Sequence, residues 1–337
     1  MVKTLERPLL LALEGMKKVA KLSPKASAYV YDLINRQVFT DLSWHERMLA
    51  DRVRVEAYRR GIQGAIKPGD VVIDLGTGTG ILAFMASQAG AKHVYAIDHS
   101  DFIDVAREIG ARNGFKNITF VAQNSSEFSP PEKVDIVLQE QFGNVAFGEN
   151  MVMNLLDLKR RCLKPTGRIV PALFDIYVEP VSLKDEYRIP PIWENEGLGI
   201  DVSFLETYQG LKKYIGKFHG LRHLKNFEVE HSLCEPSPIL SVDMNAISGE
   251  QDISKRYEVS KPVLRGGNLD GYCLYFRGRF DNGTSFDNGP ASPQTNWDCI
   301  VIRKRRRTIK AGARLTYSVD LEEIEKPRTW KVEDTLD

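Results

Sequence analysis

Residues 71–80 read VVIDLGTGTG, an apolar run that passes directly into three glycines at alternating positions. The apolar segment Val71–Ile73 predicts a parallel strand that is buried on both faces. Glycines permit positive φ angles and let a ligand approach the backbone where a Cβ would otherwise stand. Because an apolar helix is expected from Ile81 to about Ala89, the turn would present a helix N-terminus to that ligand. The stretch predicts a strand–turn–helix unit that binds a nucleotide-like cofactor.

Strands and helices are expected to alternate on both sides of this turn. Further strands are expected at residues 93–97, 118–121 and 134–138, with helices between them, and one long helix is expected over residues 45–66. This alternation is typical of a doubly wound α/β domain.

The predicted secondary structure changes near residue 171. Strand-like segments then follow one another, separated by turns rich in glycine, asparagine and aspartate, and a helical stretch is expected over residues 202–213. This pattern predicts an antiparallel β domain with a helical interruption.

The overall composition narrows the class of protein. The 337 residues carry 46 basic and 45 acidic side chains, so no general attraction to nucleic acid is expected. The four cysteines lack metal-ligand spacing, and no apolar run is long enough to cross a bilayer. We therefore expect a cytoplasmic protein without a metal or a membrane span. The basic run 303–307 has two interpretations, a solvated hairpin end or, less favoured, a contact to RNA.

Two acids accompany the glycine turn. Asp74 directly precedes it, and Asp98 ends the next expected strand, where a carboxylate can accept both hydroxyls of a ribose. The glycine spacing is GxGxG and differs from the GxGxxG of dinucleotide-binding folds. A tight turn with an incidental acid is the alternative interpretation.

A second candidate site follows the fourth expected strand, where residues 140–149 read EQFGNVAFGE. Glu140 and Glu149 flank a turn that contains glycine, and two facing carboxylates repel each other unless a cation lies between them. A guanidinium fits best, because its planar fork can bridge both carboxylates. Exposed loop glutamates without a ligand are the alternative.

Several motifs, in order along the chain, resemble those of the protein arginine methyltransferases, a branch of the class I S-adenosylmethionine-dependent methyltransferases. They are the helix His45–Arg54, the glycine turn, the two-glutamate loop, the segment Trp193–Asp201 and the loop Thr295–Trp297. The resemblance implies a helical segment at 1–44, a Rossmann-like S-adenosylmethionine domain at 45–170, and an antiparallel β-barrel domain at 171–337. It also implies a helical dimerisation arm at about 186–225 and hence a homodimer.

The resemblance further implies roles for individual residues. His45 and Arg54 would contact the methionine portion of the cofactor, and Ser126 or Glu127 its adenine. Met48, unless it is simply helix core, would shape the space around the methyl together with Met151. The expected cofactor-binding residues are His45, Met48, Arg54, Asp74, Gly76, Thr77, Gly78, Gly80, Ile81, Leu82, Asp98, His99, Ser126, Glu127, Glu140 and Met151. The expected catalytic residues are Glu140, Glu149 and Asp51, and the expected substrate-binding residues are Glu140, Glu149, Asn296 and Trp297.

The sequence departs from the family pattern on the acceptor side. A pair of tyrosines is absent from residues 35–39, Gln141 stands where the family has tryptophan, and Asn296 stands where it has histidine. An asparagine cannot relay a proton at neutral pH. These departures indicate a divergent, bacterial-type or small-molecule-arginine member. We expect methyl transfer to a guanidino group of free arginine, of a small guanidino compound or of protein arginine. Methylation of another nitrogen acceptor and a silent cofactor-binding partner protein are the alternatives.

Overall fold

The computed structural model describes residues 41–195, 197, 199–214 and 220–336. Of the helical segment expected at residues 1–44, residues 1–40 lie outside the described residues. The chain divides by its own contacts into two compact units. Of the described residues, unit 1 takes those up to Asp51 with Ala65–Glu140 and Met153–Val170, and unit 2 takes Arg52–Gly64, Gln141–Val152 and those from Pro171 onward.

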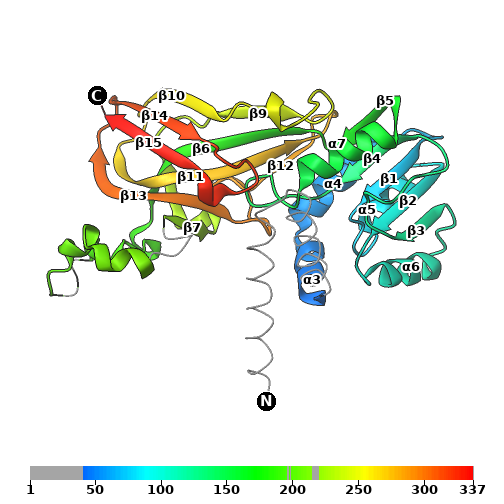
Figure 1. Ribbon diagram of the computed structural model, residues 1–337, viewed down its shortest axis with the longest axis horizontal. Coiled ribbons are helices and arrows are strands. Elements are labelled where there is room, and N and C mark those ends of the chain that lie inside the picture. The colour runs from blue at the N-terminus through cyan, green and yellow to red at the C-terminus, as the bar shows by residue number, and fades with distance from the viewer. Residues whose placement is uncertain (1–40, 196, 198, 215–219, 337) are drawn as a thin grey trace, which may run out of the picture. The chain divides into compact units, whose positions relative to one another are not determined.

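Unit 1 contains a five-stranded parallel sheet in the order β3-β2-β1-β4-β5 (Figure 1). Every residue of β1 is buried, as expected for a strand covered on both faces. The expected α/β class is therefore confirmed. The strands are β1 (Val71–Leu75), β2 (His93–Asp98), β3 (Ile118–Ala122), β4 (Val134–Gln139) and β5 (Leu163–Val170).

The first helical segment differs from the sequence prediction. The single helix expected over residues 45–66 is wrong, because the chain leaves the helical conformation at Asp51, with φ −72° and ψ 86°. Aspartate favours such breaks because its carboxylate competes for nearby backbone N–H groups. The helices are α3 (Leu42–Ala50), α4 (Arg52–Ala65), α5 (Ile81–Gln88), α6 (Ile103–Arg112) and α7 (Met151–Arg161).

Most of helix α4 groups with the β strands of unit 2, although the expected range 45–170 placed it with the cofactor domain. Tyr58 is 1% exposed and packs against the rings of Phe280 and Phe286. Gly61 leaves space for the ring of Phe280, since a Cβ there would come within 2.3 Å of it. The packing of α4, rather than its place in the sequence, decides the unit to which it belongs.

Unit 2 is built from two antiparallel sheets, which confirms the expected antiparallel β domain. The larger sheet has the order β7-β13-β11-β6-β8, with β12 on β11 and β9 on β6, and the smaller has the order β10-β14-β15. The strands are β6 (Leu173–Leu183), β7 (Leu221–Leu224), β8 (Val229–Ser232), β9 (Leu240–Asp243), β10 (Arg256–Pro262), β11 (Gly267–Arg279), β12 (Ser285–Asp287), β13 (Cys299–Ile309), β14 (Arg314–Asp320) and β15 (Lys331–Leu336).

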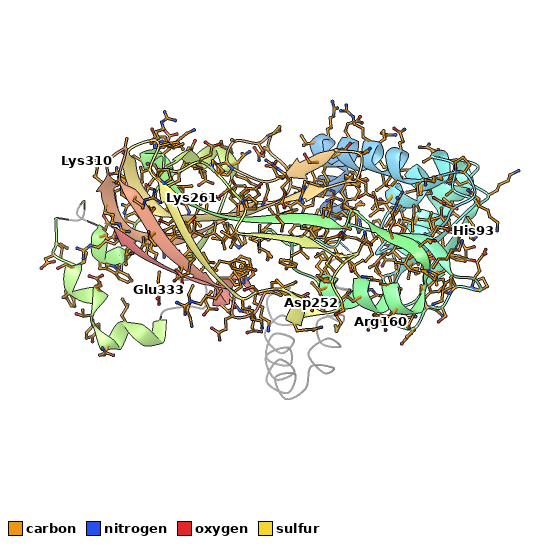
Figure 2. The ribbon with its side chains drawn as sticks, turned by 90° about the horizontal axis from the view of Figure 1, so that it is seen from above. His93, Arg160, Asp252, Lys261, Lys310 and Glu333 are labelled. Carbon is orange, nitrogen blue, oxygen red and sulfur yellow. The ribbon has the colours of Figure 1, made fainter. Side chains whose placement is uncertain are left out.

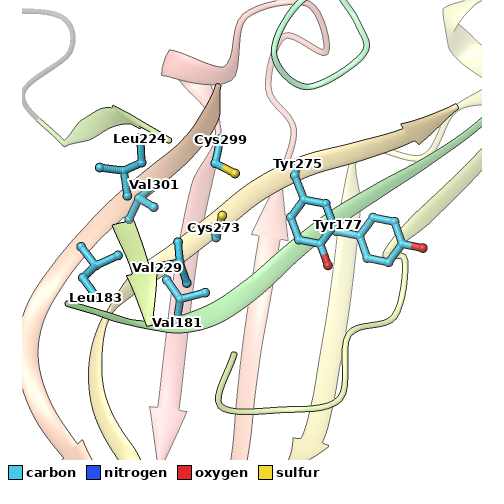
Figure 3. Packing of buried hydrophobic residues seen from close by; sticks show 9 residues of the cluster. All are labelled: Tyr177, Val181, Leu183, Leu224, Val229, Cys273, Tyr275, Cys299 and Val301. Carbon is cyan, nitrogen blue, oxygen red and sulfur yellow. The ribbon is translucent and has the colours of Figure 1, made fainter. Parts of the chain in front are cut away.

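The two sheets contact each other through polar groups. The Tyr317 hydroxyl on β14 donates to the carbonyl of Val178 on β6 at 2.7 Å. Lys261 on β10 lies 2.5 Å from the buried carboxylate of Glu179 on β6. Side chains from five strands of the larger sheet also form an apolar cluster (Figure 3). The cluster consists of Tyr177, Val181, Leu183, Leu224, Val229, Cys273, Tyr275, Cys299 and Val301.

The arm, defined here as residues 185–214, projects from the strands of unit 2 (Figure 1). The helix expected over residues 202–213 is replaced by short 3₁₀ turns at Ser203–Glu206 and Gln209–Tyr214. Two further 3₁₀ turns, Asp185–Tyr187 and Ile192–Glu194, precede them. The expected helical stretch is therefore divided into short 3₁₀ turns.

The basic run 303–307 is not a hairpin end. It lies within β13, and the turn to β14 comes later, at Lys310 (Figure 2). Its charges face acids of the same unit: Arg306 contacts Asp270 at 2.6 Å and Asp185 at 2.7 Å, and Arg307 contacts Asp334 at 2.5 Å. Since Asp185 belongs to the arm, the run attaches the arm to the sheet. This compensation of charge removes the reason for expecting RNA there.

Candidate active site

The parallel sheet of unit 1 brings three site residues to one edge. Leu75 pairs with Ile97 on one side and with Gln139 on the other. The next residues along these strands, Gly76, Asp98 and Glu140, therefore leave the sheet at the same level. The strand order reverses between β1 and β4, and open α/β sheets bind ligands at such a switch point, outside the carboxyl ends of the strands.

The glycine turn has the backbone that its sequence predicts, since Gly76, Gly78 and Gly80 all have positive φ, at 70°, 51° and 86°. A Cβ on Gly76 would meet nothing within 4 Å, so the turn has open space beside it. Gly80 serves packing instead, because a Cβ there would come within 2.7 Å of the Phe84 ring. The turn therefore fits a ligand at its first glycine.

Asp98 holds the turn as well as facing the expected ligand position. Its Oδ2 accepts the backbone N–H of Gly78 at 2.9 Å, and its Oδ1 accepts that of Ser100 at 2.8 Å. A carboxylate offers about four lone-pair positions, so these two bonds leave capacity for ribose hydroxyls. Asp98 thus fits the role that the sequence assigned to it.

Asp74 lies beneath the turn and is fully buried. Its Oδ2 accepts the Thr77 hydroxyl at 2.5 Å and the Ala83 N–H of helix α5 at 3.0 Å. Burial is the main cause that raises the pKa of Asp74 to about 7, and the negative charges of Asp98 and Glu140 contribute in the same direction. The charges of Asp98 and Glu140 therefore act on the same end of the sheet as Asp74, which suits a cationic ligand.

The raised pKa of Asp74 leads to a pH prediction. A folded protein that keeps this proton up to about pH 7 binds more protons than the unfolded chain, whose aspartates ionise near pH 3.9, so stability should fall as pH rises between these values. Between pH 5 and pH 8, the free energy of unfolding should fall in the wild type and should fall by roughly 1–4 kcal/mol less in Asp74→Asn, which has no carboxyl group at this position. Urea unfolding at both pH values measures this difference, and identical losses in the two proteins would contradict it.

Helix α3 covers the turn through a ring contact that the sequence did not reveal. His45 is 4% exposed and stacks on Phe102, with ring centroids 3.7 Å apart. A Cβ on Gly78 would lie 3.2 Å from the His45 ring, so glycine allows the helix its close approach. Phe102 directly precedes α6, and only the fold shows that it supports His45.

The remaining predicted residues of unit 1 lie around the same sheet but stay predictions as ligand contacts. Met48 is half-buried on α3, and Asp51 is 9% exposed where that helix ends. Ser126 and Glu127 are exposed in the turn after β3, where Ser126 bonds to Asn124. The others stand on the glycine turn, on the start of α5 and directly after β2: Thr77, Ile81, Leu82 and His99.

The acceptor loop, defined here as residues 141–150, belongs to unit 2 and is closed on itself. Gly143 and Ala146 exchange backbone hydrogen bonds of 3.1 and 3.2 Å. A Cβ on Gly148 would lie 3.0 Å from the Gly143 nitrogen, so glycine at this position allows the close approach of the two strands of the loop. Glu149 and Asn150 have φ of 56° and 55°, a left-handed conformation that is uncommon outside glycine and concentrates at functional sites.

Trp297, a predicted substrate-binding residue, contacts the acceptor loop and Arg54 within unit 2. Its Nε1 donates to the Phe142 carbonyl at 3.3 Å, and its ring is 8% exposed. The guanidinium of Arg54 lies 5.4 Å above the centre of this ring. Asn296 is half-buried beside it, and Met151 is fully buried after the loop. Arg54 was expected to reach the cofactor; that role stays a prediction, and the structure adds its contact with Trp297.

Two other kinds of site are not indicated. Among the described residues, no group of three or more His, Cys, Asp or Glu side chains is placed to hold a metal ion. Within the same residues, no helix combines the length and the apolar character needed to span a membrane.

Known proteins resemble the chain in sequence and in fold. Residues 66–197 match the family described as Methyltransferase domain. Protein arginine N-methyltransferase 1 of Dictyostelium discoideum is 28% identical over 93% of this chain and 89% of its own length. Protein arginine N-methyltransferase 6 of Xenopus tropicalis is 28% identical over 79% of each chain.

Among solved structures, the Trypanosoma brucei PRMT1 enzyme–prozyme heterotetrameric complex with AdoHcy superposes with a TM-score of 0.74. It is 26% identical and covers 89% of this chain and 94% of its own. The likeness spans both the parallel sheet and the antiparallel strands. The chain therefore resembles the protein arginine N-methyltransferases in sequence over most of its length and in its fold.

Proposed function

We propose that the protein transfers a methyl group from S-adenosylmethionine to a guanidino nitrogen of arginine. The observation that carries this proposal is the acceptor loop, which is closed by glycines, flanked by Glu140 and Glu149, and left-handed at Glu149. Such a backbone persists only where its surroundings hold it. Relatives named for arginine methylation support the same substrate class.

S-adenosylmethionine would be held by unit 1. The open space at Gly76 and the carboxylate of Asp98 fit its ribose, and the carboxylates around the turn suit its positive charge. The bound cofactor supplies a methyl group on a sulfonium. His45, held on Phe102, would close this side of the site and keep water away from it.

The acceptor nitrogen loses its proton late in the proposed mechanism. Free arginine has a pKa far above neutral pH, so deprotonating it at pH 7 before transfer would cost about 9 kcal/mol. Neighbouring carboxylates favour the cation and cannot reduce that cost. The glutamates would instead orient one nitrogen and draw positive charge onto the others, and Glu149 or Asp51 would accept the proton as the new bond forms.

We propose free arginine or a small guanidino compound as the acceptor, with protein arginine as the second candidate. Asn296 supports this choice, because it replaces an ionisable side chain next to Trp297 with a neutral amide. One experiment tests both the methyl transfer and the choice of acceptor. Purified protein is incubated with methyl-labelled cofactor and with free L-arginine, an arginine-rich peptide or no acceptor. Label on free arginine alone supports the small acceptor, and label on the peptide alone favours protein arginine. No label on any guanidine overturns the function and favours a silent or different methyltransferase.

We also propose that the protein is a cytoplasmic homodimer that associates through the arm. Ile200, Phe204 and Tyr208 are 71%, 58% and 55% exposed there, and an apolar surface of this kind is typical of an interface. Sedimentation equilibrium should give twice the 38.1 kDa mass of one chain. A mass of one chain at micromolar concentration would contradict the dimer.

A further inference from the structure

Asn144 anchors the acceptor loop to the strands of unit 2 with three hydrogen bonds. Its Oδ1 accepts the backbone N–H of Asp298 at 3.1 Å, and its Nδ2 lies 3.1 Å from Nδ1 of His223. Its backbone carbonyl accepts Nδ2 of Asn288 at 2.9 Å. One residue of the loop therefore bonds to three separate segments.

Asn288 extends this contact into the core of the unit. It is 2% exposed, and its Nδ2 also donates to the Asp298 carbonyl at 2.8 Å, while its Oδ1 accepts the N–H of Phe276 on β11 at 3.0 Å. A buried amide whose hydrogen bonds are satisfied fixes its neighbours in one arrangement. The acceptor loop and the segment Asn296–Asp298 are thus tied to the same buried group.

His223 connects Asn144 to a different part of unit 2. It lies on β7, which follows the arm in the chain and pairs with β13 at Ile300. Because Oδ1 of Asn144 already accepts from Asp298, its Nδ2 is the donor to His223, and Nδ1 of that ring is the acceptor.

The loop closure alone does not place the loop. The bonds between Gly143 and Ala146 give the loop its shape, but they lie entirely within it. Its position relative to the strands depends on contacts such as those of Asn144, Trp297 and Phe142. Glu149 follows five residues after Asn144, so a displaced loop displaces its carboxylate.

We propose that Asn144 is a positioning residue that holds the acceptor loop, and with it Glu149, through Asp298, Asn288 and His223. The contact with His223 makes β7, the strand that returns from the arm, part of this support. The catalytic consequence rests on the proposed function, whereas the anchoring of the loop does not.

Hydrogen exchange and kinetics together test the proposal. In Asn144→Ala, the amides of residues 143–151 should exchange at least tenfold faster without any acceptor present. The value of kcat/KM for the guanidino acceptor should fall at least tenfold, with the Kd of the cofactor within twofold of wild type. His223→Ala should give a smaller change of about threefold, and the double variant should resemble Asn144→Ala alone, because both remove one shared contact.

Asn268→Ala is the matched control, since Asn268 accepts a 2.9 Å bond from Thr308 between β11 and β13 of the same sheet and lies outside the acceptor network. It should leave loop exchange and kcat/KM unchanged. If Asn144→Ala does not fold, Asn144→Asp replaces it, because the carboxylate still accepts from Asp298 but cannot donate to His223. Unchanged loop exchange overturns the proposal, as does kcat/KM within twofold of wild type. If no guanidine is methylated at all, exchange alone decides.

Discussion

Glu149→Gln should lower kcat for the guanidino acceptor by about 10²–10³, the effect of removing one group that stabilises developing charge. Glutamine keeps the size and the polar character of the side chain, and it can adopt the left-handed backbone that Glu149 has, with φ 56°. The substitution therefore removes the negative charge and the proton acceptor while the closed loop remains. Steady-state turnover with labelled cofactor measures the loss.

The matched control for Glu149→Gln is Glu230→Gln, an exposed glutamate on β8 of the same unit. Its turnover should equal that of wild type. The Kd of the cofactor should stay within about twofold in both variants, since the glycine turn and Asp98 lie in unit 1. Turnover of Glu149→Gln near the wild-type value, with the cofactor bound normally, would exclude Glu149 from catalysis.

Asp270→Asn should reduce the free energy of unfolding by about 3–5 kcal/mol, the range for breaking a buried ion pair on one side. The Asp270 side chain is 1% exposed and lies between Arg306 of β13, at 2.6 Å, and Arg188 of the arm, at 2.9 Å. It also accepts the N–H of Leu183 at 2.9 Å. Asparagine can still accept from Leu183, but it leaves two partly buried guanidinium groups with less compensating charge.

Chemical denaturation followed by tryptophan fluorescence measures this loss. Arg305→Gln is the control, because Arg305 is 77% exposed and lies 3.8 Å from Glu206, so its substitution should change stability by less than about 1 kcal/mol. A loss below about 1 kcal/mol for Asp270→Asn would show that the arm is not held by this carboxylate.

The sequence predicted best what short-range patterns encode. The apolar strand β1, the glycine turn and Asp98 follow from residue spacing within about thirty positions, and the structure places them as expected. Glu140 and Glu149 flank a turn, but this spacing alone left exposed loop glutamates as the alternative, and the resemblance to the protein arginine methyltransferases led to their prediction as site residues. In each case the signal lies in neighbouring residues, so one sequence suffices to read it.

Features that depend on distant partners escaped the sequence. Nothing around Asn144 indicates that Asn288 and His223 lie beside it. These two residues are separated from Asn144 by 144 and 79 positions in the sequence. The basic run was misinterpreted for the same reason, since its compensating acids, such as Asp185, stand far away in the chain. The break at Asp51 was missed because apolar spacing continued across it.

The division of the chain also bears on how the protein can be dissected. The backbone passes between the two units at residues 51–52, 64–65, 140–141, 152–153 and 170–171. A fragment cut after Val170 would keep α4 and the acceptor loop but lose Phe280, Asn288 and Trp297, against which they fold. Neither half is therefore an independent module. In a chimera joined to another methyltransferase at that boundary, α4 and the acceptor loop would face foreign packing partners, so we expect misfolding rather than exchanged specificity.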